Sequence, residues 1–350
     1  MAVANVVPAG SPGARPFGTM SSEETRRDGT RLSAVICTRG RPDLVARALG
    51  SLTGQDVHEV VVVDNAPEDD ATCRLVRERF PGVRYAVEPS RGLDFARNRA
   101  LREATGEVVA YLDDDAVAAP GWASTLRSVF ASDPRVGACT VRVEALAIET
   151  PGQRLFEENG GYARGLERIR LPDDADRPLH GHAAPLIAWA VSVGSGCSFA
   201  LRRGLVLDLG GFDEALDLGW ELPGGGDHDM LWRVLQAGYH VVYEPEALAH
   251  HEHRKEESAV YAQLAGHQRG LVAFLTKSVV TARGRRRLSV LTFLLWRLLK
   301  PGVRLVRRAA RRDPLPAAAL LRMWVNAIMG PAAYLSARRT ARLRAAEAHL

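Results

Sequence analysis

From residue 31 onward, short apolar runs alternate with segments that have helical spacing. The runs are rich in valine, which is typical of strands buried on both faces of a parallel sheet. They are LSAVIC (32–37), HEVVVVDN (58–65), VRYAVE (83–88) and EVVAYLDDD (107–115). The helical segments between them are PDLVARALGSL (42–52), EDDATCRLVRERF (68–80) and LDFARNRALREA (93–104). This alternation predicts an α/β fold with a mostly parallel central sheet.

The pattern is less regular beyond residue 115. It predicts helices over 121–131 and 227–238, strands over 136–146 and 191–203, and a short strand pair over 240–254. The stretch 150–190 is rich in Pro, Gly and Asp, and we expect an irregular, variable loop there.

The two ends of the chain differ from the middle. Residues 1–30 are rich in Pro, Gly, Ser and Ala, which predicts a disordered leader before a main domain over 31–280. Residues 281–350 contain the apolar stretches 288–299 and 317–335, interrupted by arginines, which predict a basic amphipathic helical tail. Such a tail either lies on an anionic membrane surface or packs on the domain.

Charge is distributed unevenly over the 350 residues, whose formal net charge is +5. Between Glu257 and Asp313 there is no acidic residue but there are thirteen Lys and Arg residues, so the basic character belongs to the tail. That run matches no nucleic-acid-binding module, so we expect no nucleic-acid partner. Arginine far outnumbers lysine, which favours a GC-rich bacterial genome.

The four cysteines show no CxxC spacing, so neither a zinc site nor a disulfide framework is indicated. The N-terminus lacks a signal-peptide pattern, and no stretch reaches the roughly 20 apolar residues of a spanning helix. We therefore expect a cytoplasmic protein, peripheral on the inner face of the cell membrane if the tail binds lipid.

Three adjacent carboxylates, Asp113, Asp114 and Asp115, end the fourth apolar run. Adjacent carboxylates repel one another and resist desolvation, so a bound cation would explain them. Mn²⁺ and Mg²⁺ are typically held by one or two carboxylates and completed by substrate phosphates. The alternative is a polar strand exit whose aspartates cap the next segment.

Polar residues also end the first two runs. Thr38, Arg39 and Arg41 suit a phosphate or sugar, and Asp64 suits the hydroxyls of a ribose or a base. Because the carboxyl ends of parallel strands meet at one sheet edge, these residues should lie near the three aspartates. The chain has no GxGxxG after its first strand and no GxxxxGK[ST], which argues against dinucleotide and P-loop sites. The alternative is that each residue is there for a structural reason, because such residues are common in turns.

Taken in order, the motifs resemble the family 2 glycosyltransferases with the GT-A fold, a Rossmann-like fold of nucleotide-diphospho-sugar transferases. The resemblance covers residues 31 to about 254. It rests on CTRGRPD, EVVVVDNAP, RGLDFARNRAL, ATGEVVAYLDDD, GGFDEAL, PGGGDHDMLWRVLQAG and YEPEALAHH. It implies transfer of a sugar from a nucleoside diphosphate donor, usually with inversion at the anomeric carbon.

The resemblance also implies roles for single residues. Nucleotide-sugar binding falls to Thr38, Arg39, Asp64, Arg97, Asp113 and Asp114. Asp115 matches the metal-binding member of the DxD motif, and His251 is the best metal ligand of the cluster His250, His251 and His253. Mn²⁺ or Mg²⁺ is the implied cofactor.

The general base is implied at the start of the helix over 227–238. Asp227 matches the family's catalytic aspartate, but Gly226 stands where the family usually has glutamate, so Asp229 is a second candidate. Both aspartates also suit a helix N-terminus, which is the alternative reading.

The implied donor is a UDP- or dTDP-sugar, and the acceptor is a saccharide, a lipid-linked compound or a small molecule. Two rival functions use the same kind of fold. A sugar nucleotidyltransferase should have a Gly-rich phosphate loop after the first strand, which CTRGRPD resembles poorly. A non-catalytic nucleotide-sugar-binding protein should not keep Arg97, Asp115 and Asp227 together.

Overall fold

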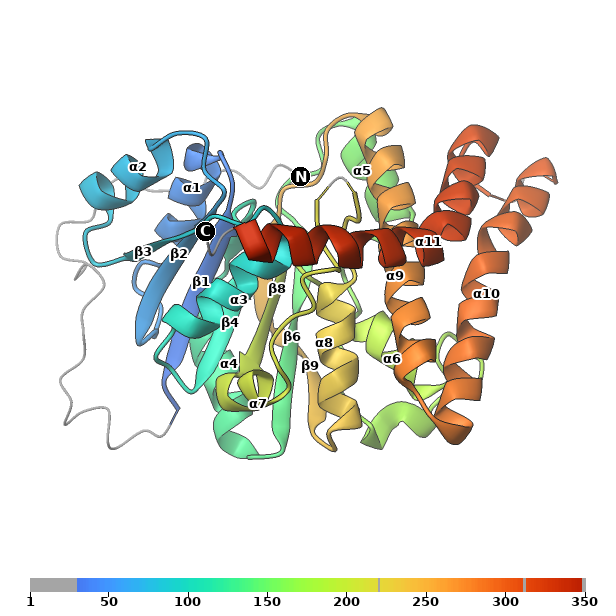
Figure 1. The fold of residues 1–350 in the computed structure, drawn as a ribbon, viewed down its shortest axis with the longest axis horizontal. Helices are drawn as coiled ribbons and strands as arrows, with labels where there is room; N and C mark the ends of the chain where they lie inside the picture. The colour runs from blue at the N-terminus through green and yellow to red at the C-terminus, as the bar shows by residue number, and fades with distance from the viewer. Residues whose placement is uncertain (1–29, 220, 311–312, 348–350) are drawn as a thin grey trace.

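The computed structural model describes residues 30–219, 221–310 and 313–347, and apart from Thr30 the predicted leader lies outside the described residues. Within these ranges a nine-stranded sheet has the order β3-β2-β1-β4-β8-β6-β9-β5, with β7 paired to β9 (Figure 1). Its first four strands are β1 (Leu32–Thr38), β2 (Glu59–Asn65), β3 (Arg84–Glu88) and β4 (Val108–Leu112). They pair in parallel, which confirms the predicted fold class.

The remaining strands make the sheet mixed. They are β5 (Ala116–Ala118), β6 (Val136–Ala145), β7 (Ile169–Leu171), β8 (Ser198–Arg202) and β9 (His240–His251). Strand β8 runs antiparallel to both β4 and β6, whereas β6 and β9 are parallel.

Two strand predictions were wrong in detail. The pair predicted over 240–254 is the single strand β9, whose pairing with β6 shifts between Val141 and Arg142 and then resumes. The irregularity takes up the residues around Pro245. Only Ser198–Arg202 of the strand predicted over 191–203 is extended, because helix α6 (Leu186–Val193) continues to Val193.

Helices cover both faces of the sheet because alternate residues of its central strands point to opposite sides. Ala34 and Ile36 of β1 pack on one side, with α1 (Pro42–Leu52) and α4 (Trp122–Ser132). Val35 and Cys37 pack on the other, with α3 (Leu93–Glu103) and α8 (Gly226–Gln236). The remaining short helices are α2 (Ala71–Arg79) and α7 (Arg203–Asp208).

The stretch predicted as an irregular loop contains regular structure. Helix α5 (Pro151–Glu158) begins with a capping box between Thr150 and Gln153 and has proline in its first turn. Strand β7 and a short 3-10 helix (Asp173–Asp176) follow before α6.

Three long helices follow the sheet: α9 (Glu257–Thr281), α10 (Gly284–Ala309) and α11 (Ala317–Glu347). Helix α11 packs on α9 and α10, and it bends, which suits the Pro331 inside it. Its second half crosses in front of α9, α8 and α3 (Figure 1). Buried residues of the tail, such as Val290 and Tyr334, join the core on the α3 side of the sheet. None of the helices in the described ranges combines the length and apolarity needed to cross a bilayer.

Candidate active site

A cavity of about 920 Å³ lies at the carboxyl ends of β1 and β4 and extends to α8, α9, α10 and α11. Its sheet side brings together most of the predicted site. Residues lining that side include Cys37, Arg41, Arg97, Asp113, Asp114, Asp115, Asp217, Asp227, His228 and His251.

The first strand end and the aspartate triplet are tied together directly. Asp114 is fully buried, and it accepts a hydrogen bond from the Thr38 hydroxyl at 2.6 Å and pairs with Arg41 at 2.6 Å. Arg41 also reaches Asp115 at 3.2 Å. Burial outweighs the charge of Arg41 and raises the pKa of Asp114 to about 6. Asp114 therefore holds Arg41 in place at the cavity wall and fixes the Thr38 hydroxyl behind it.

Asp115 and His251 meet because two distant strands pair. The antiparallel pairing of β5 with β9 sets Ala116 opposite His251, and Asp115 Oδ1 lies 3.3 Å from His251 Nε2. Burial alone would raise the pKa of Asp115, but the hydrogen bond and charge of His251, with Arg41, outweigh it and lower the pKa to about 2. The ring of His251 is fixed by His253, because the Nδ1 atoms of the two rings lie 3.0 Å apart.

This pair offers one carboxylate oxygen and one imidazole nitrogen at the cavity. Both are ligand types that Mn²⁺ accepts, and the carboxylate suits Mg²⁺ as well. Across the residues described, no group of three or more His, Cys, Asp or Glu side chains is arranged to hold a metal. A divalent cation here would therefore take its remaining ligands from phosphate oxygens and water, as is common for Mg²⁺.

Arg97 is a buried cation surrounded by carboxylates. Its guanidinium lies 2.9 Å from Asp94 and 3.6 Å from Asp217, and it rests against the rings of Phe199 and Phe212. Burial alone would lower its pKa, but the surrounding carboxylates, Asp94 first among them, outweigh burial and raise it. Arg97 thus supplies a permanent positive charge at the cavity wall.

Asp227 lies at the N-terminus of α8 and lines the cavity. Its Oδ1 is 3.0 Å from His228 Nδ1. Burial would raise the pKa of Asp227, but the charges of His228 and Arg97 and its hydrogen bonds hold it below the ordinary value. Asp227 is therefore ionised at neutral pH and able to accept a proton.

The preceding residue, Gly226, has no room for a side chain. A Cβ built on Gly226 would lie 1.8 Å from Asp94 Oδ2, so the Asp94 carboxylate occupies the place where a side chain of residue 226 would begin. Asp94 is fully buried, and burial raises its pKa well above the ordinary value despite Arg97. A carboxylate therefore does lie beside Asp227, but α3 supplies it.

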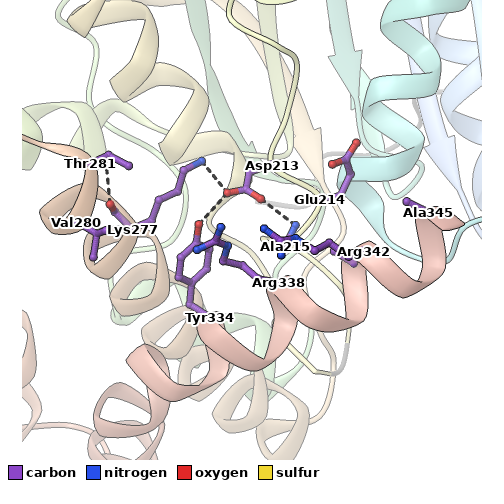
Figure 2. Close-up of a pocket in the computed structure, with 11 residues that line it drawn as sticks. Asp213, Glu214, Ala215, Lys277, Val280, Thr281, Tyr334, Arg338, Arg342 and Ala345 are labelled. Atoms are coloured by element: carbon purple, nitrogen blue, oxygen red, sulfur yellow. Dashed lines mark hydrogen bonds and ion pairs between the residues drawn. The ribbon is translucent and has the colours of Figure 1, made fainter.

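Asp229 points elsewhere. It pairs with Arg233 at 2.8 Å and with Lys277 at 2.7 Å, and it does not line the cavity. Lys277 also pairs with Asp213 at 2.8 Å, and Asp213 accepts a hydrogen bond from the Tyr334 hydroxyl of α11 (Figure 2). This ion cluster borders a second cavity of about 440 Å³ between residues 213–215, α9 and α11. The geometry gives Asp229 a place in the packing of α9 and α11.

Two further predicted nucleoside contacts, like Thr38, do not line the cavity. Asp64, opposite Thr38 in the β1–β2 register, accepts a hydrogen bond from the Tyr85 hydroxyl at 2.9 Å. Its buried Oδ1 has no hydrogen-bond partner among the described residues. Arg39 pairs with exposed Glu68 at 2.6 Å. The roles of both residues stay predictions.

Several residues that line the cavity, or that lie beside its lining, were missed from the sequence. Tyr162 and Arg164 follow α5 in the stretch expected to be irregular, and the Tyr162 ring packs against His251 with centroids 5.1 Å apart. Asp94 lies inside the quoted motif GLDFARN but gives no signal of its own. The position of Asp217 shows only in the folded chain.

Comparisons with known proteins agree with this geometry. The profile of the family described as Glycosyl transferase family 2 matches residues 33–210. The chain is 29% identical over 231 residues to a pre-mycofactocin glycosyltransferase of Mycobacterium tuberculosis, covering 64% of this chain and 43% of that protein. It is 28% identical over 241 residues to the succinoglycan biosynthesis protein ExoM of Rhizobium meliloti, covering 66% and 69%. The chain thus spans less than half the length of the first of these relatives.

Among solved structures, the mannosyltransferase PcManGT from Pyrobaculum calidifontis, in complex with GDP-Man and Mn²⁺, is similar with a TM-score of 0.53. The match covers 91% of this chain and 87% of that one at 22% identity. At this identity the likeness concerns the fold.

Proposed function

The chain belongs to glycosyl transferase family 2, and from this premise we propose that it moves a sugar from a nucleoside diphosphate donor to an acceptor hydroxyl with inversion at the anomeric carbon. One observation carries the proposal: the Asp115–His251 pair and Asp227 line the same cavity. Asp115 and His251 can hold a cation with a diphosphate, and Asp227 is a separate ionised carboxylate that can act on the acceptor.

In the proposed reaction, Asp227 removes the proton of the acceptor hydroxyl while the oxygen of that hydroxyl forms a bond to the anomeric carbon. The bond between that carbon and the diphosphate breaks, and the electron pair leaves with the diphosphate. Its low pKa keeps Asp227 ionised, and His228 holds the carboxylate in position. Arg97 and Arg41 place positive charge on the same wall, where the negative charge develops.

For the cofactor we propose Mn²⁺ or Mg²⁺ held by Asp115 and His251. When bound, the ion offsets the charge of the departing diphosphate. The Mn²⁺ in the PcManGT structure supports this assignment by fold likeness. For the donor we propose a UDP- or dTDP-sugar, with the free oxygen of Asp64 accepting a hydrogen bond from the nucleoside.

The test is calorimetric binding of UDP, dTDP and GDP with and without Mn²⁺. We expect metal-dependent binding that is lost in Asp115→Ala and kept in the control Asp208→Ala, which changes an exposed aspartate on α7. Failure of the folded wild-type chain to bind any nucleoside diphosphate would overturn the proposal.

The base is tested separately with Asp227→Asn. We expect unchanged nucleotide binding and a turnover number lower by about 10²- to 10⁴-fold, since proton transfer typically contributes that much. Donor hydrolysis to free sugar is a suitable assay before the acceptor is known. The anomeric configuration of the product, read by NMR, decides between inversion and retention.

For the tail we propose peripheral contact with a membrane surface. Helix α10 begins and ends with exposed arginines, and it keeps exposed leucines and Trp296 between them. Basic helices with an apolar face bind anionic lipid surfaces in this way.

A further inference from the structure

The carboxylates of the active-site cavity are confined to one end, where Arg41 and Arg97 lie among them. All the carboxylates that line it belong to the sheet side and to residues 217 and 227. The part contributed by α9, α10 and α11 includes three arginines, Arg269, Arg297 and Arg322, and no carboxylate. The end with carboxylates and arginines suits a cation with its diphosphate, whereas the end whose charged side chains are all arginines, the basic end, suits a second, anionic group.

Arg297 is the clearest feature of the basic end. Its Nη2 donates to Gln268 Oε1 at 3.0 Å, while its Nε is buried without a hydrogen-bond partner among the described residues. Within the same residues no carboxylate lies at ion-pair distance from it. Burial lowers its pKa to about 10, so it stays cationic at neutral pH. A partly buried cation without a counter-ion leaves an interaction that an anion can complete.

The wall next to this end is apolar and open. Met329, which lines the cavity, is about half exposed on α11, in one row with Leu321, Val325 and Ile328. On α10 the neighbours of Arg297 are Trp296, half exposed, and Leu299, 60% exposed. These spacings of three and four residues place an exposed apolar stripe on each helix.

The charge around these stripes indicates what covers them. Arg285, Arg286 and Arg287 at the start of α10 and Arg307 and Arg308 near its end are exposed. No acidic residue occurs between Glu257 and Asp313. A protein partner would need a matching acidic, apolar groove, whereas an anionic lipid surface provides both properties at once.

We propose that the acceptor is a lipid-linked anionic amphiphile, taken by the enzyme from a membrane surface on which α10 and α11 lie. The phosphate of the acceptor pairs with Arg297 and Arg322, its apolar chain follows the stripes of α10 and α11, and its hydroxyl reaches Asp227. The acceptor assignment rests on the proposed transferase function, while the membrane contact does not depend on it.

Vesicle flotation of the full chain tests the surface. We expect binding to vesicles of phosphatidylcholine with phosphatidylserine, weakening with salt, and none to phosphatidylcholine alone. The double variant Leu295→Glu/Leu299→Glu should bind at least about tenfold more weakly, because it removes apolar contact and adds like charge to the lipid. The control Leu166→Glu changes an exposed leucine outside the tail and should bind as wild type. Equal binding of all three proteins, or none, overturns the contact.

Calorimetry with decyl phosphate, below its micelle concentration, tests the acceptor end. We expect decyl phosphate to bind more tightly than inorganic phosphate, and Arg297→Gln to weaken it about fivefold while Mn²⁺-UDP binding is unchanged. Equal affinities for decyl phosphate and inorganic phosphate would mean that the site binds free anions and not an amphiphile. Unchanged affinity of Arg297→Gln for decyl phosphate would mean that the phosphate of the acceptor does not bind at this end of the cavity. Alkyl phosphate binding without any nucleotide binding would overturn both the transferase function and the acceptor assignment. The proposed membrane contact would still stand.

Discussion

Replacing Gly226 by alanine tests how the start of α8 is built. The added Cβ would lie 1.8 Å from Asp94 Oδ2, although real Cβ atoms essentially never approach closer than 3.0 Å. The carboxylate would have to move by more than an ångström, and Asp94 is buried and paired with Arg97 at 2.9 Å. Breaking a buried ion pair costs about 3–5 kcal/mol, so we expect Gly226→Ala to lower the free energy of unfolding by about that amount.

Urea denaturation of four proteins measures the effect as a cycle: wild type, Gly226→Ala, Asp94→Ala and the double variant. In the Asp94→Ala background the three atoms nearest to the Cβ are gone, so Gly226→Ala should cost less than about 1 kcal/mol there. The matched control is Gly50→Ala in α1, where a Cβ meets nothing within 4 Å. We expect that change to be neutral or to stabilise by up to about 1 kcal/mol.

Two results would refute this reasoning. Gly226→Ala could prove as stable as Gly50→Ala, or its cost could be the same with and without Asp94. Either outcome would mean that the Asp94 carboxylate does not occupy the space above Gly226.

Two further predictions concern charges. Lys277→Met leaves buried Asp229 and half-buried Asp213 without their shared cation, so we expect it to destabilise by about 3 kcal/mol in urea unfolding. The exposed-lysine control Lys255→Met should cost less than about 0.5 kcal/mol, and equal costs would contradict the cluster's role. The pKa of Asp227 is lower in the folded than in the unfolded chain, so its ionised form stabilises the fold above about pH 4 and loses that effect as the pH falls. The melting-temperature difference between wild type and Asp227→Asn should therefore shrink from about pH 7 to about pH 3, and a constant difference would contradict the assigned shift.

The sheet was predictable from the sequence because strands β1, β2 and β4 are buried on both faces and read as nearly continuous apolar runs. The pairing of Asp115 with His251 was suggested only by resemblance. Strand β5, which brings them together, has three residues and is too short to show a periodicity.

Other parts of the site depend on contacts that no local pattern encodes. The carboxylate beside Asp227 comes from α3, far away in the chain, so the sequence showed only that Gly226 departs from the family. Asp229 looked equivalent to Asp227 by position, yet two residues along a helix point to different sides, and Lys277 and Arg233 hold Asp229 away from the cavity. The capping box that starts α5 was readable in Thr150 and Gln153, but the surrounding Pro and Gly residues obscured it.

The bend in α11 has a consequence for how the protein is made. The second half of that helix reaches back to a much earlier part of the chain, where Arg344 donates to the carbonyl of Arg91, 253 residues before it, at 2.6 Å. Contacts so distant in sequence form late, because a long loop must close before they give any stabilisation. On the ribosome, the first strands can assemble well before residue 344 emerges, but the second half of α11 can dock on them only after that residue has emerged. Until then the apolar residues of α9 and α11 that meet in the finished fold stay exposed to other chains and to chaperones.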